Sequence, residues 1–214
     1  MRRIEANKTF YRVCKSVFDI VFSALIILVL FIPCLIFALF VAADTKTWPI
    51  YRQWRVGLHG KEFRIFKFRT MVPDADDVEK WLDEEQTAQW IMGEEIKDDP
   101  RITTLGKQLR ISGIDEIPTF LNVLLGHMSL LGPTPLPRLE LDTWYSDAEQ
   151  EELLAVRPGM MGPWQSRAFS ELSYLDCTRQ ELELTYARKA GFALDKELLR
   201  DACNYPLSAF NEAG

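Results

Sequence analysis

Residues 20–43, IVFSALIILVLFIPCLIFALFVAA, contain no charged side chain and carry one proline, Pro33, near their middle. A run of this length is typical of a membrane helix, because about 20 apolar residues in a helix cross the hydrocarbon core of a bilayer. The run therefore predicts a membrane segment. The residues on either side of it decide whether that segment spans the bilayer or returns.

Both flanks of this run are basic. Short flanks rich in Lys and Arg stay on the cytoplasmic side, so a straight span would carry one of them across. Pro33 lacks an N–H and can bend the helix, which would keep both flanks on one side. A single spanning anchor with a mild kink is the other interpretation, and the residues alone leave both open. Asp19, at the edge of the run, is expected at the lipid headgroups or paired with Arg12 or Lys15. The basic residues are Arg2, Arg3, Lys8, Arg12 and Lys15 before the run and Lys46, Arg52, Arg55, Lys61, Arg64, Lys67 and Arg69 after it.

The composition limits the function classes. The chain has 214 residues, enough for one domain with a hydrophobic core and a membrane element. Its formal net charge is −6, but the first third is basic and residues 72–99 are strongly acidic. This division fits a basic surface that faces anionic lipid. It does not fit a nucleic-acid-binding protein, which needs a basic stripe on a basic domain. The four cysteines show no paired spacing, so we expect them to be reduced.

The stretch RVGLHGKEFRIFKFRTM, residues 55–71, predicts a β-hairpin whose turn lies between Gly57 and Gly60. Lys67 and Arg69 are two residues apart, and such residues point to the same face of a strand. They could hold a phosphate there. A basic surface hairpin without a ligand is the alternative.

Two adjacent carboxylates, Asp115 and Glu116, stand at the start of a helix predicted over residues 114–125, where apolar residues recur at helical spacing. A carboxylate can attack phosphorus as a covalent nucleophile, and Mg²⁺ is held by one or two carboxylates together with substrate phosphates. Arg110 could neutralise the charge that develops. The alternative is structural, because Ser112 to Asp115 has the pattern of a capping box.

The rest of the chain predicts loops and helices. Residues 132–137 contain three prolines and predict a rigid extended loop. Arg157-Pro158-Gly159 predicts a turn. Helical spacing over residues 140–155 and 181–199 predicts helices.

Taken together, these motifs resemble the monotopic phosphoglycosyl transferases, bacterial sugar transferases that start many lipid-linked glycans. They span nearly the whole chain in family order. The motifs are the apolar run with its proline, Arg55-Val-Gly57, Lys67-Phe-Arg-Thr-Met71, Asp99-Pro-Arg-Ile-Thr103, Gly106 to Arg110, Ile114-Asp-Glu-Ile-Pro118, Asn122-Val, Met128-Ser-Leu-Leu-Gly-Pro133, Val156-Arg-Pro-Gly159 and Gln165.

The resemblance implies transfer of a sugar-1-phosphate from a UDP-sugar to a polyprenyl phosphate, usually undecaprenyl phosphate, with release of UMP. It implies that Asp115 is the nucleophile that forms a phosphosugar ester and that the Asp115–Glu116 pair holds Mg²⁺, with Glu116 as the main ligand. Its implied phosphate contacts are Lys67, Arg69, Arg110 and Arg157. The partners it implies are the UDP-sugar, the polyprenyl phosphate, membrane lipids, no nucleic acid and, as an open alternative, a second copy of the chain in a homodimer.

The expected fold is α+β and mostly helical. Residues 1–43 are expected to form an amphipathic approach and a re-entrant membrane helix broken at Pro33, as the resemblance favours. Residues 44–214 are expected to form a cytoplasmic catalytic domain with a short β-hairpin and amphipathic helices at the membrane surface. The implied location is the cytoplasmic face of the bacterial inner membrane, and the extent of the match suggests the minimal catalytic unit alone.

Three departures from the family pattern concern the nucleotide or sugar contacts, for which the resemblance suggests residues 133–135, Gln165 and Glu183. Pro133 and Pro135 enclose Thr134, where the family usually has Arg. Glu183 replaces an Asp, and Ser166-Arg167-Ala168 replaces N-G-R. The departures keep two alternatives open: a catalytically impaired membrane scaffold, and a metal-dependent hydrolase that sends the phosphosugar ester to water.

Overall fold

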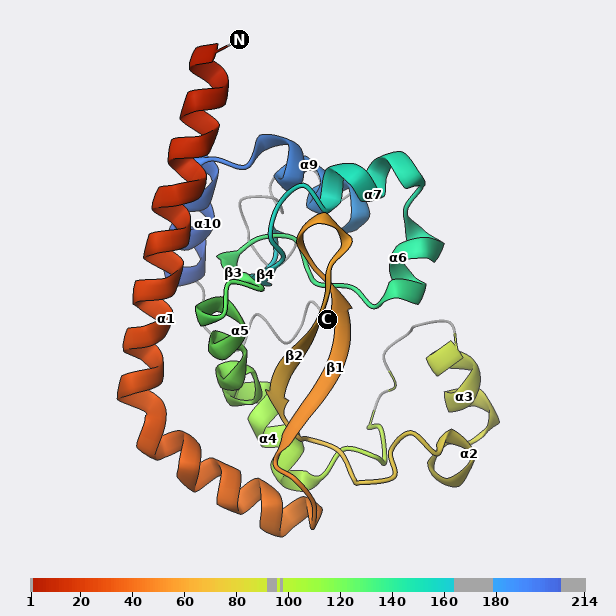
Figure 1. The fold of residues 1–214 in the computed structure, drawn as a ribbon. Helices are drawn as coiled ribbons and strands as arrows, with labels where there is room; N and C mark the ends of the chain where they lie inside the picture. Colours follow the sequence, from red (N-terminus) through yellow and green to blue (C-terminus); the bar gives the residue numbers. More distant parts are fainter. Residues whose placement is uncertain (1, 92–95, 97, 164–178, 205–214) are drawn as a thin grey trace. The chain divides into compact units, whose positions relative to one another are not determined.

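The computed structural model describes residues 2–91, 96, 98–163 and 179–204 (Figure 1). Helices dominate the described residues, and the strands form two small sheets, so the predicted mostly helical α+β class is confirmed. The elements in chain order are α1 (Arg2–Thr45), β1 (Ile50–Val56), η1 (Leu58–Gly60), β2 (Glu62–Phe68), α2 (Val78–Trp81), α3 (Glu84–Ile91), α4 (Thr104–Ser112), η2 (Ile114–Thr119), α5 (Phe120–Leu124), β3 (Ser129–Leu131), α6 (Arg138–Trp144), α7 (Asp147–Leu153), β4 (Gly159–Met161), α9 (Arg179–Lys189) and α10 (Phe192–Asn204).

The chain forms two compact units. Helix α1 and the β1–β2 hairpin contribute residues to both. The predicted division at residues 43 and 44 separates a membrane element from a catalytic part, and it stays a prediction. Unit 1 consists of Met1–Val29, Arg52–Ile65 and Thr119–Pro206, and unit 2 of Leu30–Tyr51, Phe66–Pro118 and Leu207–Gly214.

Helix α1 contains the apolar run (Figure 1). By length and composition, its part Thr9–Thr45 could cross a membrane. Large apolar side chains along it are exposed, among them Leu28 and Leu39, which are 76% and 73% accessible. The helix continues through Pro33, so a break at this residue is not confirmed, and the re-entrant path stays a prediction.

The predicted hairpin is confirmed as β1 and β2. Its turn is closed by the Gly57 N–H, which donates to the Lys61 carbonyl over 2.9 Å, and Gly60 has φ +75°. Within unit 1, Phe63 and Ile65 are buried on one face of β2 and pack against apolar side chains near α5.

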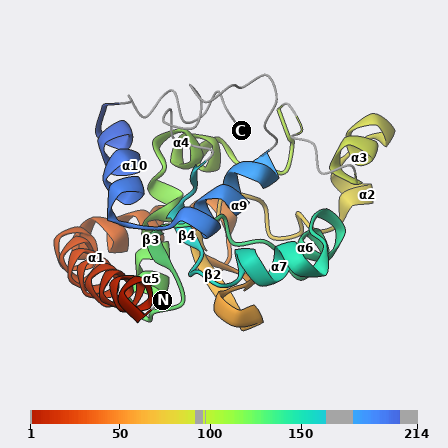
Figure 2. The same cartoon turned by 90° about the horizontal axis from the view of Figure 1, so that it is seen from above.

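In unit 1, β3 and β4 form a parallel pair with Ser129 opposite Gly159 (Figure 2). Helices α7 and α9 also lie side by side. A Cβ atom on Gly159 would lie 2.1 Å from the Gly132 nitrogen, so this close contact requires a glycine. The turn predicted at residues 157–159 is wrong, because the backbone there is extended and the Pro158 carbonyl accepts from the Ser129 N–H.

In unit 2, α4 lies directly on the backbone that follows β2. Gly106 makes this possible, because a Cβ atom there would lie 2.0 Å from the Thr70 carbonyl oxygen. The Thr103 side chain caps the helix by accepting from the Gly106 N–H over 2.9 Å. Leu109 of α4 is buried and packs with Phe68 and Val41.

The helix predicted over residues 114–125 is divided into η2 and α5. Pro118 lies inside η2, and a proline removes a backbone donor from a helix. The capping box predicted at Ser112 does not form. Ser112 is the last residue of α4, and its hydroxyl donates backwards to the Gln108 carbonyl over 2.8 Å.

We expect Gly106→Ala to lower the free energy of unfolding by roughly 2–3 kcal/mol, because the added methyl must displace the Thr70 backbone. Thermal unfolding in detergent, followed by circular dichroism, measures the change. Gly191→Ala is the matched control, since its Cβ would have its nearest neighbour at 3.7 Å. Equal stability of the two variants would contradict the close contact.

Candidate active site

The two adjacent carboxylates lie in the first turn of η2. Gly113 ends α4 in the left-handed conformation, with φ +67°, and its N–H donates to the Arg110 carbonyl. This reversal starts η2 directly after α4. Asp115 is 9% accessible, whereas the Glu116 side chain is 43% accessible. The pair therefore presents one buried and one open carboxylate.

Two cations of unit 2 accompany the pair. Lys67, on β2, donates to Oε1 of Glu116 over 2.6 Å. Arg110, in the last turn of α4, donates through Nε to the Thr70 hydroxyl over 2.9 Å. The structure thus brings Lys67, Arg110, Asp115 and Glu116 together within unit 2. Thr70 belongs to the motif at residues 67–71, but the sequence gave it no role, because its contact with Arg110 joins segments 40 residues apart.

Burial raises the pKa of Asp115 above its ordinary value. The charges of Lys67 and Arg110 lower it, and the neighbouring Glu116 raises it further. The protein therefore opposes the cost of a buried carboxylate with two cations, without removing that cost.

A buried ion pair fixes the segment before α4. The Arg101 guanidinium donates to both oxygens of Asp99, over 2.9 and 2.7 Å, and the Arg101 backbone N–H also donates to Oδ1 over 2.9 Å. Burial alone would raise the pKa of Asp99, but the bonds and charge of Arg101 hold it below its usual value. The motif at residues 99–103 contains both partners, but the motif alone does not predict their pairing.

Two predicted phosphate contacts have other partners. Arg69 follows β2, donates through Nε to the Trp48 carbonyl over 3.2 Å and lies over the Tyr51 ring. Arg157 belongs to unit 1, where Nη1 donates to the Ser16 hydroxyl over 2.6 Å. Their roles as phosphate ligands stay predictions.

No group of three or more His, Cys, Asp or Glu side chains that could hold a metal occurs among the described residues. Asp115 and Glu116 nevertheless fit Mg²⁺, which prefers oxygen ligands and commonly takes only one or two carboxylates beside substrate phosphates. The accessible Glu116 is the more available of the two.

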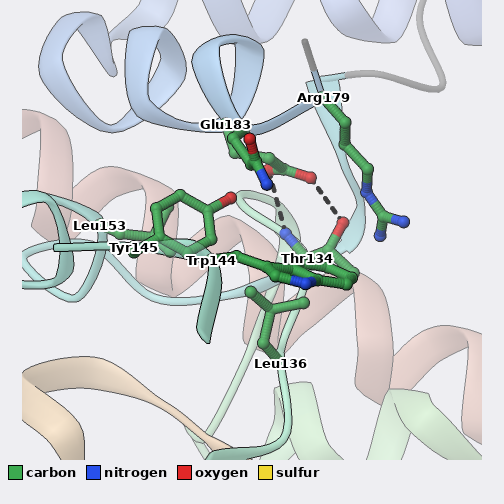
Figure 3. A pocket seen from close by; sticks show the side chains of 8 residues that line it. Thr134, Leu136, Trp144, Tyr145, Leu153, Arg179 and Glu183 are labelled. Atoms are coloured by element: carbon green, nitrogen blue, oxygen red, sulfur yellow. Dashed lines mark hydrogen bonds between the residues drawn. The ribbon is translucent and has the colours of Figure 1, made fainter. Parts of the chain in front are cut away.

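Thr134 and Glu183 meet in a cavity of about 290 Å³ in unit 1 (Figure 3). The Thr134 hydroxyl donates to Oε1 of Glu183 over 2.6 Å, and the Thr134 N–H donates to Oε2 over 3.1 Å. Pro133 and Pro135 are buried on either side of Thr134. Gln165, the other predicted contact, lies outside the described residues. The remaining side chains of the lining are Leu136, Trp144, Tyr145, Leu153, Arg179 and Gln180.

Comparison with known proteins decides the family. A family model described as bacterial sugar transferase matches residues 10–207, which is nearly the whole chain. The chain belongs to the bacterial sugar transferase family. The resemblance seen in the sequence motifs is thereby confirmed.

Curated members of the family have related names. The chain is 38% identical over 177 residues to the undecaprenyl-phosphate galactose phosphotransferase of Salmonella typhimurium, covering 80% of this chain and 37% of that protein. It is 37% identical over 166 residues to the UDP-galactose-lipid carrier transferase of Erwinia amylovora, covering 76% and 34%. It is 33% identical over 186 residues to the exopolysaccharide production protein ExoY of Rhizobium meliloti, covering 85% and 80%. The chain thus spans about a third of the length of the first two relatives.

Two departures from the bacterial sugar transferase pattern therefore contact each other. Thr134 replaces the usual Arg and Glu183 the usual Asp, and the two side chains share a hydrogen bond. Glu183 is one methylene longer than the usual Asp, and its partner Thr134 is shorter than the usual Arg. The two replaced residues are therefore hydrogen-bonded to each other, and neither side chain is left without a partner.

Glu183 makes the stability depend on pH. Burial raises its pKa to about 7, against the bonds from Thr134, whereas the unfolded carboxyl titrates near 4.5. The folded state binds the proton more tightly, so this contribution is complete below pH 4.5 and is lost as the pH rises through 7. We expect the free energy of unfolding to fall by up to about 1.4 kcal/mol per pH unit across that window.

Denaturant unfolding between pH 5 and 8 measures this slope. Glu183→Gln, which keeps the shape and loses the titration, should flatten it. Glu181→Gln, on the exposed side of the same helix, should leave it unchanged. A steep slope that persists in Glu183→Gln would assign the titration to another group.

Proposed function

We propose that this chain transfers a sugar-1-phosphate from a UDP-sugar to a polyprenyl phosphate such as undecaprenyl phosphate. The family membership and the names of the relatives support the reaction class. The observation that carries the proposal is the buried Asp115 beside the open Glu116, with Lys67 bonded to Glu116 and Arg110 at the end of the preceding helix.

In the first displacement, a carboxylate oxygen of Asp115 attacks the phosphorus that bears the sugar. An aspartyl–phosphorus bond forms, the bond to the bridging pyrophosphate oxygen breaks, and UMP leaves with both electrons of that bond. Lys67 and Arg110, both in unit 2, would neutralise charge on the phosphoryl oxygens. Only the ionised form of Asp115 can attack, which explains the use of two nearby cations.

In the second displacement, an oxygen of the polyprenyl phosphate attacks the same phosphorus. The aspartyl bond breaks, the Asp115 carboxylate is regenerated, and a polyprenyl diphosphate sugar is released. Because the transfer occurs in two steps, the soluble donor and the lipid acceptor need not be bound together. This suits a site whose two substrates reside in different phases.

Glu116, with Asp115 beside it, would hold Mg²⁺, which would supply Lewis-acid stabilisation to the phosphates of the donor. Lys67 already occupies Oε1 of Glu116. This ion pair directs the glutamate toward β2 before any ligand arrives.

The exposed apolar surface of α1 supports a membrane location, since a contiguous apolar surface of this size is costly in water. We propose that α1 enters the inner leaflet of the bacterial inner membrane and returns at Pro33, with the catalytic residues on the cytoplasmic face. The basic flanks on both sides of the run favour this path over a span.

A catalytically impaired scaffold is the second candidate, motivated by Thr134 and Glu183. It predicts no UMP release from any UDP-sugar of a panel while lipid binding persists. A hydrolase would instead produce free sugar phosphate in the same assay. The hydrogen bond between Thr134 and Glu183 weakens the scaffold hypothesis, because the two replaced side chains bond to each other.

We expect Asp115→Asn to reduce UMP release by a factor on the order of a thousand or more, because the amide cannot form the phosphosugar ester. The assay combines the full chain in nanodiscs with UDP-sugars, polyprenyl phosphate and Mg²⁺. Asp142→Asn, at an exposed position of α6, is the matched control and should keep the wild-type rate. Undiminished turnover by Asp115→Asn would remove this residue from the mechanism.

Cysteine labelling tests the re-entrant path. In a background without native cysteines, single cysteines at Glu5 and Ile50 should both react with a membrane-impermeant reagent from the cytoplasmic side. The physical reason is that both basic flanks remain on that side. Labelling of the two positions from opposite sides would show that α1 spans the bilayer.

A further inference from the structure

A second cavity, of about 170 Å³, lies in unit 1 beside the first half of α1. It is separate from the cavity at Glu183 and contains none of the unit 2 residues of the candidate active site. Residues of β3, α9 and the segment before β4 complete its wall. The lining consists of Tyr11, Arg12, Lys15, Ser16, Asp19, Leu58, His59, Ser129, Leu131, Ala155, Val156, Arg157, Tyr186, Ala187, Arg188 and Ala190.

One cation of this wall is already neutralised. Lys15 donates to Oδ2 of Asp195 over 2.6 Å. The same carboxylate accepts from the Tyr11 hydroxyl over 2.8 Å and from the Tyr186 hydroxyl over 2.7 Å. This network holds α1 against α9 and α10 and leaves little capacity for a ligand.

The carboxylate of the wall is also engaged, but by neutral donors. Asp19 accepts from the Ser129 hydroxyl over 2.6 Å and from the Leu130 N–H over 3.4 Å. The pairing of Asp19 with Arg12 or Lys15 considered from the sequence is therefore replaced by contacts with β3. Asp19 leaves one negative charge at the wall.

The remaining cations outweigh that charge. Arg12 is exposed, and Arg188 meets Glu152 only in a solvent-accessible pair, which adds little stability. Arg157 donates through Nη1 to Ser16, but its Nε is buried and has no hydrogen-bond partner within the described part of the chain. A buried donor without an acceptor is unfavourable, because it loses its hydrogen bonds to water and gains none in return. The wall thus has surplus positive charge and an unused donor.

The rest of the wall is apolar, and the helix beside it carries exposed apolar side chains. Leu58, Leu131 and Val156 line the cavity. On α1, Phe10 is 63% accessible and directly precedes the lining residue Tyr11. Val17 is 57% accessible and directly follows the lining residue Ser16. A ligand that suits both parts has an anionic oxygen head and a hydrocarbon body.

We propose that this cavity binds the phosphate of a membrane lipid, with Arg157, Arg12 and Arg188 as its cationic contacts and the aliphatic wall against the first part of the lipid chain. Charge-assisted bonds from guanidinium groups to phosphate are strong and directional. The site fixes the amino-terminal half of α1 at the level of the lipid headgroups. The site does not include Asp115, and in the case that polyprenyl phosphate is its ligand it rests on the proposed function.

Native mass spectrometry of the full chain in detergent tests the site. The probes are phosphatidylglycerol, polyprenyl phosphate, diacylglycerol and inorganic phosphate. We expect one or both phosphate-bearing lipids to bind at least about tenfold more tightly than diacylglycerol. Arg157→Gln and Arg12→Gln should each weaken this binding about tenfold, the effect of losing one charge-assisted bond.

Lys189→Gln is the matched control, because it removes one positive charge from α9 without touching the cavity. Should Arg157→Gln fail to fold, the exposed Arg12 carries the test. Asp115→Asn should bind lipid as the wild type does, which separates lipid binding here from the covalent step at Asp115. Binding of only polyprenyl phosphate would identify the acceptor as the ligand, and binding of phosphatidylglycerol a general headgroup site.

Three results would overturn the proposal. Diacylglycerol could bind as well as the phosphate-bearing lipids, inorganic phosphate could bind while neither lipid does, or both arginine variants could retain wild-type affinity.

Discussion

The contact between Gly106 and the Thr70 backbone determines the candidate active site of unit 2. Because residue 106 has no side chain, α4 can lie on the segment that follows β2. One helical turn later, Arg110 reaches the Thr70 hydroxyl, and Gly113 then reverses the chain. The two carboxylates follow at once. A single close backbone contact therefore sets the position of both the cation and the acidic pair.

Unit 1 is organised by buried carboxylates whose partners are mostly neutral. Asp19, Glu183 and Asp195 accept from hydroxyl and backbone donors, and Asp195 also accepts from Lys15. Except for the bond from Tyr186 to Asp195, these bonds join segments far apart in the chain. Buried acids held in this way are costly to leave unpaired, so they favour one arrangement of the helices over others.

The two units have different proposed roles. The acidic pair and its cations suit phosphoryl chemistry, whereas the cavities of unit 1 suit recognition of a polar ligand and of a lipid phosphate. Family membership explains why these parts occur in one chain. The contact between Thr134 and Glu183 shows how a member of the family can depart from its usual residues at two positions and keep both side chains hydrogen-bonded.

The sequence by itself determined the apolar helix, the hairpin, the acidic pair and the family, because these depend on local period, composition and ordered motifs. It failed where the outcome depends on distant segments. The strand at Gly159 forms only because it pairs with β3, and the helix after Ile114 is divided by Pro118 and by its place after α4. The partners of Asp19, Arg157 and Glu183 were likewise decided by tertiary structure. The sequence specifies the charge of a side chain, but its hydrogen-bond partner depends on which distant segments pack against it.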